Sequence, residues 1–259
     1  MEGLKFLARS RSVRLLADRG RAYRPGVLHH YRWRGLDIAY RPGTSDVVLI
    51  DDILLRGNNG AEYAVPAGWN GAAGAVRVVL DIGANIGIST LYLASVFPDA
   101  RVFAFEPVPE NFELLRRNTR PVDRITAVEA ALGAADCPLP IYSSDDPGNL
   151  GGFSLHEAGT DRTSSRAIDV RNAQREMERL GVAGAEVIKI DTEGSEWEIL
   201  TSFSPSFLAS TQLILGELHG RRDFALLDVL AEGFDIGVRK EVGSRRSNFC
   251  ALRRGASST

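Results

Sequence analysis

Three ionisable residues stand at the ends of two apolar runs in the second half of the sequence, where they could act in acid–base chemistry. Asp191 follows the run at residues 186–190. Glu217 and His219 close the run at residues 212–218. If both runs are parallel strands, their carboxyl ends meet at the edge of the sheet where ligands bind. Alternation along an extended chain also places Glu217 and His219 on the same side, so the three residues form a candidate catalytic group.

Removal of a proton from an attacking hydroxyl is the chemistry that this group suits. The pKa of an unperturbed imidazole is about 6.5, so His219 is the best candidate for the base. Asp191 is the alternative base, and Glu217 could orient the imidazole. The carboxylates of Asp191 and Glu217 could instead hold Mg²⁺, which takes oxygen ligands. Lys189 either reaches solvent from its strand or keeps Asp191 ionised through its charge.

A second candidate site lies upstream, in a glycine-containing turn at residues 81–87 that follows an apolar run. Gly83 and Gly87 permit backbone shapes that a Cβ disfavours. The next apolar run, at residues 102–105, ends at Glu106, 19 residues after Gly87 (106 − 87). This spacing is close to the value of about 20 in nucleotide-binding crossover units, whose acidic residue binds ribose hydroxyls. The pattern predicts a cofactor that contains a ribose.

The turn differs from that of a dinucleotide site, because Asn85 replaces the glycine that lets the backbone approach a pyrophosphate. This replacement argues against a nicotinamide-dependent oxidoreductase. The Asn85 side chain could bond an amino-acid group, and Asp81 could compensate an ammonium. S-Adenosylmethionine (SAM) has a ribose, an amino-acid group and no pyrophosphate, so SAM is the predicted cofactor.

The adenine of such a cofactor is expected beside Glu106, at the end of a third predicted strand over residues 125–132. The small side chains of Ala130 and Ala131 leave room there for a flat ring. No metal ligand is assigned. The predicted cofactor-binding residues are Asp81, Gly83, Asn85, Gly87, Glu106, Pro107, Glu129 and Ala130.

Four segments resemble, in this order, the FkbM-type SAM-dependent methyltransferases: VVLDIGANIGIST, FEPVPENFELLRRN, VIKIDTEGSEWEIL and ILGELHG. The first motif is shared by many methyltransferases, whereas the four together are more specific, and the similarity extends over residues 41–252. The resemblance implies transfer of a methyl group from SAM to a hydroxyl oxygen, often on a natural product or a sugar. It also implies a cap that closes over the cofactor, with Thr44, Asp46 and Tyr63 as candidate pocket residues.

The elements that position these residues alternate between apolar runs and helical patterns, as in a Rossmann-like α/β fold. Five parallel strands are expected, followed by a final antiparallel hairpin, which is the usual ending of SAM-dependent methyltransferases. Ser195 and Glu198 are expected to form a capping box that starts a helix. The prediction is a Rossmann-like SAM-methyltransferase fold with a mostly parallel seven-stranded sheet, an antiparallel C-terminal strand and an N-terminal helical and extended cap. The predicted strands cover residues 76–80, 102–105, 125–132, 186–190, 212–218, 235–240 and 247–252.

Length and composition suit one α/β domain with an appendage. The chain has 259 residues, of which 44% are hydrophobic and 25% charged, as in ordinary globular proteins. A stretch rich in Gly, Ala and Pro divides a cap segment, residues 1–70, from a methyltransferase domain, residues 71–259. The two cysteines lie far apart, which predicts reduced thiols. This cysteine usage, and the lack of a secretory leader or of an 18-residue apolar run, predict a cytoplasmic protein without a membrane span.

The N-terminus is basic, with ten Lys or Arg and three Asp or Glu in residues 1–41. A basic amphipathic helix is expected at residues 4–19, where it could contact anionic lipid, nucleic acid or an acidic substrate, or lie on the catalytic domain as a cap. The core lacks a sustained basic stripe and the isoelectric point is about 6.1. These features argue against a nucleic-acid partner and favour a small-molecule hydroxyl acceptor, and they leave a homo-oligomer open.

The predicted function is a SAM-dependent O-methyltransferase that acts on a hydroxyl of a small molecule, either a natural product or a sugar. One alternative is an O-methyltransferase assisted by a divalent metal such as Mg²⁺, although the chain lacks the Asp-Asn pair common in such enzymes. Another is a methyltransferase that acts on a nucleic acid or a glycan through the basic N-terminus.

Overall fold

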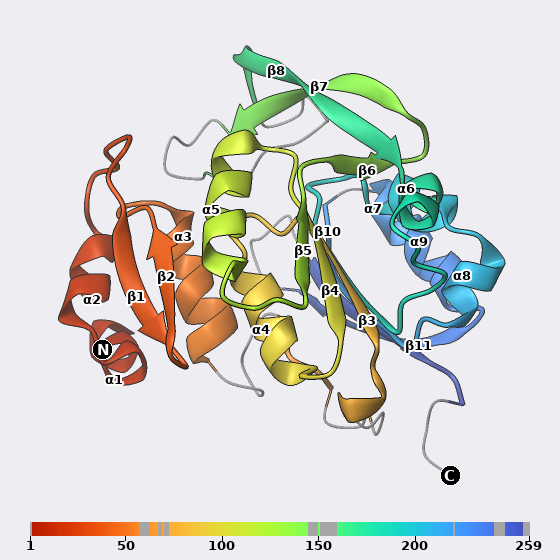
Figure 1. Cartoon of the computed structure of the whole chain (residues 1–259), viewed down its shortest axis with the longest axis horizontal. Helices are drawn as coiled ribbons and strands as arrows, with labels where there is room; N and C mark the ends of the chain where they lie inside the picture. Colours follow the sequence, from red (N-terminus) through yellow and green to blue (C-terminus); the bar gives the residue numbers. More distant parts are fainter. Residues whose placement is uncertain are drawn as a thin grey trace.

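A seven-stranded sheet forms the centre of the protein, seen here in a computed structural model that describes residues 2–56, 63–66, 69, 73–144, 150, 160–219, 221–240 and 247–255 (Figure 1). The strand order is β11-β12-β10-β9-β3-β4-β5. All of these strands run in one direction except β12, which is antiparallel to β10 and β11. The predicted fold class is therefore confirmed. The strands are β3 (Val78–Ile82), β4 (Arg101–Phe105), β5 (Ile125–Val128), β9 (Val187–Ile190), β10 (Leu213–Leu218), β11 (Phe234–Lys240) and β12 (Ser247–Arg253).

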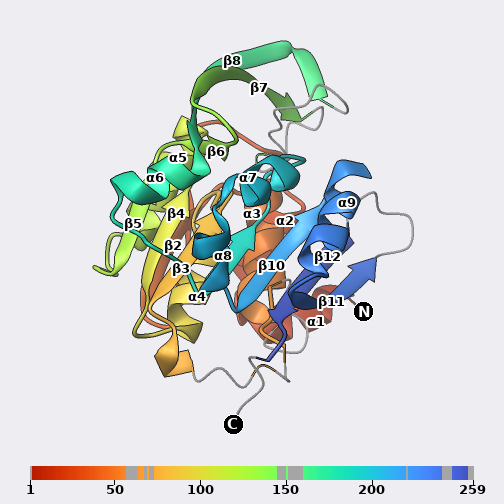
Figure 2. The same ribbon diagram turned by 90° about the vertical axis from the view of Figure 1, so that its right-hand side faces the viewer.

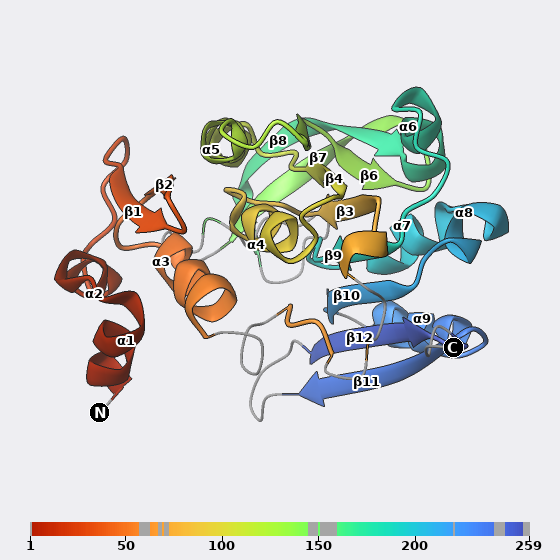
Figure 3. The ribbon, with the colours of Figure 1, turned by 60° about the horizontal axis from the view of Figure 1, so that its bottom comes forward.

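Helices cover both faces of this sheet, which explains why its central strands are continuously apolar. Val79 and Val102 pack on the α4 side, whereas Leu80 and Ile82 pack on the other. Figures 1 and 3 show α4 and α5 on one side of the sheet and α6, α7, α8 and α9 on the opposite side. The helices are α4 (Ile88–Val96), α5 (Pro109–Thr119), α6 (Ala173–Arg179), α7 (Glu196–Ser202), α8 (Pro205–Ala209) and α9 (Arg221–Leu230).

The N-terminal segment packs against α4 and shares its apolar core with that face of the sheet. Phe6 and Leu15 are fully buried in the same cluster as Val79. The single helix expected at residues 4–19 is wrong, because Arg11 adopts a left-handed conformation (φ 50°) that separates two helices. Thr44 caps α3, since its side chain accepts a hydrogen bond from the Asp46 amide. The segment contains α1 (Glu2–Ser10), α2 (Val13–Arg19), β1 (His29–Trp33), β2 (Leu36–Tyr40), α3 (Ser45–Leu49) and a π-helix (Ile50–Leu55).

A separate three-stranded sheet stands above one edge of the central sheet (Figure 2). It consists of β6 (Ala131–Gly133), β7 (Cys137–Ser144) and β8 (Thr160–Asn172). The third strand expected at residues 125–132 is therefore divided between two sheets. The division occurs because β5 ends at Val128, whose carbonyl accepts a hydrogen bond from the Ala130 amide at 3.1 Å in a tight turn. Among the described helices, none has the length and apolar character that a membrane span requires.

Candidate active site

The glycine turn after β3 is in direct backbone contact with the end of β9. Gly83 and Gly87 have φ angles of 78° and 90°, as the sequence pattern predicts. A Cβ atom on Gly83 would lie 1.8 Å from the carbonyl oxygen of Asp191. Asn85 is also left-handed (φ 50°), a conformation that asparagine tolerates better than most residues. The turn and the segment that begins at Asp191 are thus held together at the topological switch point of the sheet, between β3 and β9.

Glu106 lies at the end of β4 and is 5% exposed. Its two carboxylate oxygens accept hydrogen bonds from the amides of Asn85, at 2.8 Å, and Val108, at 2.9 Å. Burial raises the pKa of Glu106 to about 7, although these backbone hydrogen bonds favour the ionised form. The carboxylate is therefore fixed beside the glycine turn and is close to half-ionised at neutral pH.

A pocket of about 660 Å³, partly open to solvent, lies beside Glu106. Ile141 and Ile168 of the upper sheet form part of its apolar wall. Asn85 contributes a buried Oδ1 atom that accepts no hydrogen bond from the described residues. The predicted cofactor residues that line the pocket are Gly83, Asn85, Glu106, Pro107 and Ala130.

Three of the predicted cofactor residues do not line this pocket. Asp81 is fully buried and accepts hydrogen bonds from Ser89, at 2.8 Å, and Thr90, at 2.6 Å, so it faces the protein interior. A Cβ atom on Gly87 would meet Leu115 of α5, which indicates that Gly87 faces a helix. Glu129 is exposed between two buried neighbours, because alternation of the chain turns its side chain to solvent.

Lys189 is buried, so of the two possibilities that the sequence leaves open for it, the one in which it reaches solvent is wrong. Its side chain is 2% exposed and its Nζ lies 3.2 Å from Asp81 Oδ1. The same atom donates a hydrogen bond to the carbonyl oxygen of Gly83 at 2.6 Å. Lys189 thus pairs with a buried charge and holds the glycine turn in place.

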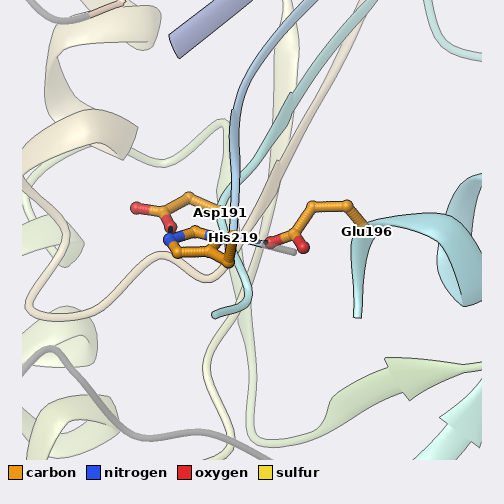
Figure 4. Close-up of side chains that lie close together, drawn as sticks. All are labelled: Asp191, Glu196 and His219. Atoms are coloured by element: carbon orange, nitrogen blue, oxygen red, sulfur yellow. Dashed lines mark ion pairs between the residues drawn. The ribbon is translucent and has the colours of Figure 1, made fainter. Parts of the chain in front are cut away.

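His219 lies at the centre of a cluster of carboxylates next to the pocket, hereafter the acidic cluster (Asp191, Glu193, Glu196, Glu217 and His219). The Nε2 atom is 3.2 Å from Glu217 Oε2, 3.4 Å from Glu193 Oε2 and 3.7 Å from Asp191 Oδ1. The Nδ1 atom is 3.3 Å from Glu196 Oε1, and Figure 4 shows that Glu196 approaches the ring from the side opposite Asp191. The juxtaposition of Asp191, Glu217 and His219 that the strand ends predict is therefore present.

The sequence assigns Ser195 and Glu198 of this turn to helix capping and places Glu193 at the ligand edge of the sheet, but it predicts no catalytic role for Glu193 or Glu196. Ser195 makes no capping hydrogen bond through its side chain, so the predicted capping box with Glu198 is wrong. Glu196 instead accepts hydrogen bonds from the amides of Thr192 (2.7 Å) and Gly194 (3.0 Å). The run of acidic residues directly after a buried strand is the signal that could have revealed both.

The charges of the acidic cluster keep His219 protonated. Burial alone would lower the pKa of His219, but hydrogen bonds to Glu196 and Glu217 and the charge of Asp191 raise it to about 11. Burial and the neighbouring Glu217 raise the pKa of Asp191. Burial also acts to raise the pKa of Glu196, but the hydrogen bond and charge of His219 lower it overall. The expected neutral imidazole with a pKa near 6.5 is therefore replaced by an imidazolium ion.

The N-terminal segment reaches this site through two connections. Tyr63 donates a hydrogen bond from its hydroxyl to Asp191 Oδ2 at 2.9 Å. Thr44 and Asp46, the other pocket candidates, are not among the residues that line the pocket. Asp46 is fully buried and pairs with Arg41 at 2.8 Å. Arg41 Nη1 in turn donates to Asn111 Oδ1 at 2.8 Å, and Asn111 does line the pocket.

Residues 81–236 match the sequence profile of a family described as the methyltransferase FkbM domain. This match covers more than half of the chain and contains the glycine turn, Glu106 and the whole acidic cluster.

Three curated proteins have sequences similar to that of this chain. AMB antimetabolite synthetase AmbE of Pseudomonas aeruginosa is 28% identical over 223 residues, which cover 69% of this chain and 10% of that protein. Hexuronic acid methyltransferase AglP of Haloferax volcanii is 29% identical over 56% of this chain and 57% of its own length. 2-O-Methyltransferase NoeI of Sinorhizobium fredii is 24% identical over 59% of this chain and 70% of its own length. The chain thus spans a small part of the first relative and under three fifths of the second.

Proposed function

Because this chain belongs to the FkbM methyltransferase family, we propose that it transfers a methyl group from SAM to a hydroxyl oxygen of a small molecule. The observation that carries the proposal is the pocket beside Glu106, which adjoins the acidic cluster. Asp191 and Glu193 belong to the cluster and also line the pocket. A cofactor in the pocket and an acceptor at the cluster would therefore be neighbours.

The residues of the pocket fit the parts of SAM. The Glu106 carboxylate, fixed by two amides, can accept hydrogen bonds from ribose hydroxyls. The buried Asn85 Oδ1 accepts no hydrogen bond from the described residues, so it can accept a hydrogen bond from the ammonium group of the cofactor. Ile141 and Ile168 provide an apolar wall for adenine. When bound, SAM supplies an electrophilic methyl group for an in-line displacement.

The acidic cluster would orient the acceptor hydroxyl and receive its proton. His219 is held as a cation, so it orients the surrounding carboxylates and is not the group that takes the proton. Asp191 and Glu193, the two cluster carboxylates that line the pocket, are the candidates for that role. The proton would pass from the hydroxyl to one of these carboxylates as the oxygen attacks the methyl carbon.

A sugar or another small polyhydroxy compound is the acceptor class that we propose. AglP is named for a hexuronic acid and NoeI for 2-O-methylation. A cluster of carboxylates supplies several hydrogen-bond acceptors, which suit the hydroxyl donors of such a compound.

The test is a combined binding and product assay on the whole chain. SAM binding is measured by calorimetry, and methyl transfer is followed with methyl-labelled SAM across a panel of sugars, uronic acids and hydroxylated metabolites. We expect SAM binding and a product whose label is on oxygen, identified by mass spectrometry and NMR. Absence of SAM binding, or a label on nitrogen or carbon, would overturn the proposal.

A further inference from the structure

Carboxylate oxygens surround His219 Nε2 at distances somewhat longer than those between adjacent ligands of a small cation. Three carboxylate oxygens, from Glu217, Glu193 and Asp191, lie 3.2, 3.4 and 3.7 Å from this nitrogen. Adjacent ligands of an octahedral ion with bonds of about 2.1 Å are about 3.0 Å apart. Glu217 Oε2 and Asp191 Oδ1 would have to approach Nε2 by about 0.2 and about 0.7 Å to reach that spacing.

In three of these four residues, the second polar atom of the side chain is contacted by a residue outside the group. The contacts are Tyr63 to Asp191 Oδ2 at 2.9 Å, Asn248 to Glu217 Oε1 at 3.3 Å, and Glu196 to His219 Nδ1 at 3.3 Å. In metal sites, outer partners of this kind orient the ligands and leave the other atom of each ligand directed at the ion. Asp191 Oδ1, the oxygen directed at Nε2, is buried and accepts no hydrogen bond from the described residues.

We propose that Asp191, Glu217 and His219 bind a divalent metal ion, with Glu196 as the residue that positions the histidine. Glu196 lies within 4.8 Å of Asp191 and His219 when the nearest ligand atoms are compared. Figure 4 nevertheless shows Glu196 on the other side of the imidazole ring from Asp191. The oxygens of Glu196 accept hydrogen bonds from two backbone amides, and Oε1 also lies 3.3 Å from His219 Nδ1. Glu196 therefore orients His219 and does not bind the ion.

The charge of the cluster favours a cation at this point. Four carboxylates surround one imidazole, and the nearby Lys189 is engaged with Asp81 and the Gly83 carbonyl. Carboxylate ligands with one imidazole suit Mg²⁺ and Mn²⁺, which take mainly oxygen ligands. The metal ion would occupy the position of the proton on Nε2.

The role of the ion rests on the proposed function, whereas its binding does not. At the edge of the pocket, a metal ion could bind the acceptor hydroxyl and lower its pKa. Asp191 would then be a ligand, and Glu193 would be the carboxylate that receives the proton from the metal-bound hydroxyl. The two pocket-lining carboxylates would therefore have different tasks.

The experiment titrates the whole protein with Mn²⁺ and detects free Mn²⁺ by electron paramagnetic resonance, followed by competition with Mg²⁺. The chain offers a matched control, because His30 and Asp37 form a histidine–aspartate pair at 2.7 Å on the surface. We expect one bound Mn²⁺ per chain and a loss of at least about tenfold in affinity in His219→Ala and in Asp191→Asn. His30→Ala and Asp37→Asn should bind as the parent does. Parent-like binding in both cluster variants, or no binding by the parent at millimolar Mn²⁺, would overturn the inference.

Glu196→Gln separates a metal site from a general loss of structure. We expect it to weaken Mn²⁺ binding by about 10–100-fold, the usual effect of losing an outer partner, while circular dichroism and SAM binding stay parent-like. Unchanged Mn²⁺ affinity in this variant would refute the positioning role. SAM binding and methyl transfer that persist in a protein without Mn²⁺ or Mg²⁺ affinity would refute the metal site and leave the proposed function intact. Mn²⁺ binding that follows the predicted pattern without any methylated product would support the metal site and count against the function.

Discussion

The hydroxyl of Tyr63 donates a hydrogen bond to the carboxylate of Asp191 across a separation of 128 residues. The aromatic ring also lies 5.1 Å from Lys189 Nζ. A residue that precedes the central sheet thus orients the side chain at the end of β9. The N-terminal segment consequently contributes to the geometry of the site as well as to the core.

Tyr63→Phe should lower kcat by about tenfold, because it removes a hydrogen bond to a charged group and keeps the ring. SAM affinity should stay within about twofold of the parent, since Tyr63 is not among the residues that line the pocket. Steady-state kinetics and calorimetry check the two parts. Tyr31→Phe is the control, because its hydroxyl donates to the distant Ser10 carbonyl at 3.0 Å. An equal kcat in the two variants would contradict the expectation.

Glu106→Gln should weaken SAM binding by about 1–3 kcal/mol, the usual cost of losing hydrogen bonds to a charged partner. The NH₂ group of the glutamine would also face one of the two backbone N–H groups that donate hydrogen bonds to the carboxylate. Calorimetry on the parent and the variant measures the difference. Glu129→Gln makes the same chemical change on an exposed side chain next to the pocket, and its SAM affinity should equal that of the parent.

The pH dependence of SAM binding should follow the ionisation of Glu106. Burial raises the pKa of this carboxyl to about 7 in the free protein, and ribose hydroxyls donate to the ionised form. The affinity for SAM should therefore be highest above pH 7, where Glu106 is ionised, and should fall by about tenfold between pH 8 and pH 6. Calorimetry across this range is the measurement. The Glu106→Gln variant should lose this pH dependence. Parallel pH profiles of SAM affinity for the parent and the variant would therefore show that Glu106 is not its source.

Lys189→Met should destabilise the fold by about 3–5 kcal/mol, because it leaves the buried Asp81 carboxylate without its cation. Both side chains are almost fully buried, with exposures of 2% and 0%. Urea unfolding followed by circular dichroism gives the change in free energy. Adding Asp81→Asn removes the uncompensated charge and should recover at least about 1 kcal/mol. A double variant no more stable than Lys189→Met would show that the ion pair is not the cause.

The sequence predicts the strands and the residues at their ends because buried parallel strands leave a clear apolar pattern. Glu106, Asp191, Glu217 and His219 all follow from that pattern, since parallel strand ends share one edge. Local patterns were insufficient where the outcome depends on distant residues. The orientation of Asp81 depends on Lys189 from another strand, and the division between β5 and β6 depends on an upper sheet that β8 completes.

The protonation state of His219 could not be predicted either, because it depends on carboxylates from several segments. An isolated histidine at a strand end has no reason to depart from its ordinary pKa. Glu193 and Glu196 are near each other in sequence, but their approach to His219 requires the turn before α7. The local capping pattern of Ser195 and Glu198 favoured a different explanation for that turn.

The contact between Gly83 and the Asp191 carbonyl has a consequence for protein engineering. No side chain separates the two backbones, so the segment that carries Asp191 cannot be reshaped without moving the cofactor turn. Loop grafts at residues 191–196 that aim at a new acceptor would therefore also reduce cofactor affinity. The upper sheet, which lines the same pocket through Ile141 and Ile168, is not part of this backbone contact. Diversifying β7 and β8 is accordingly the better route to altered specificity with the cofactor turn preserved.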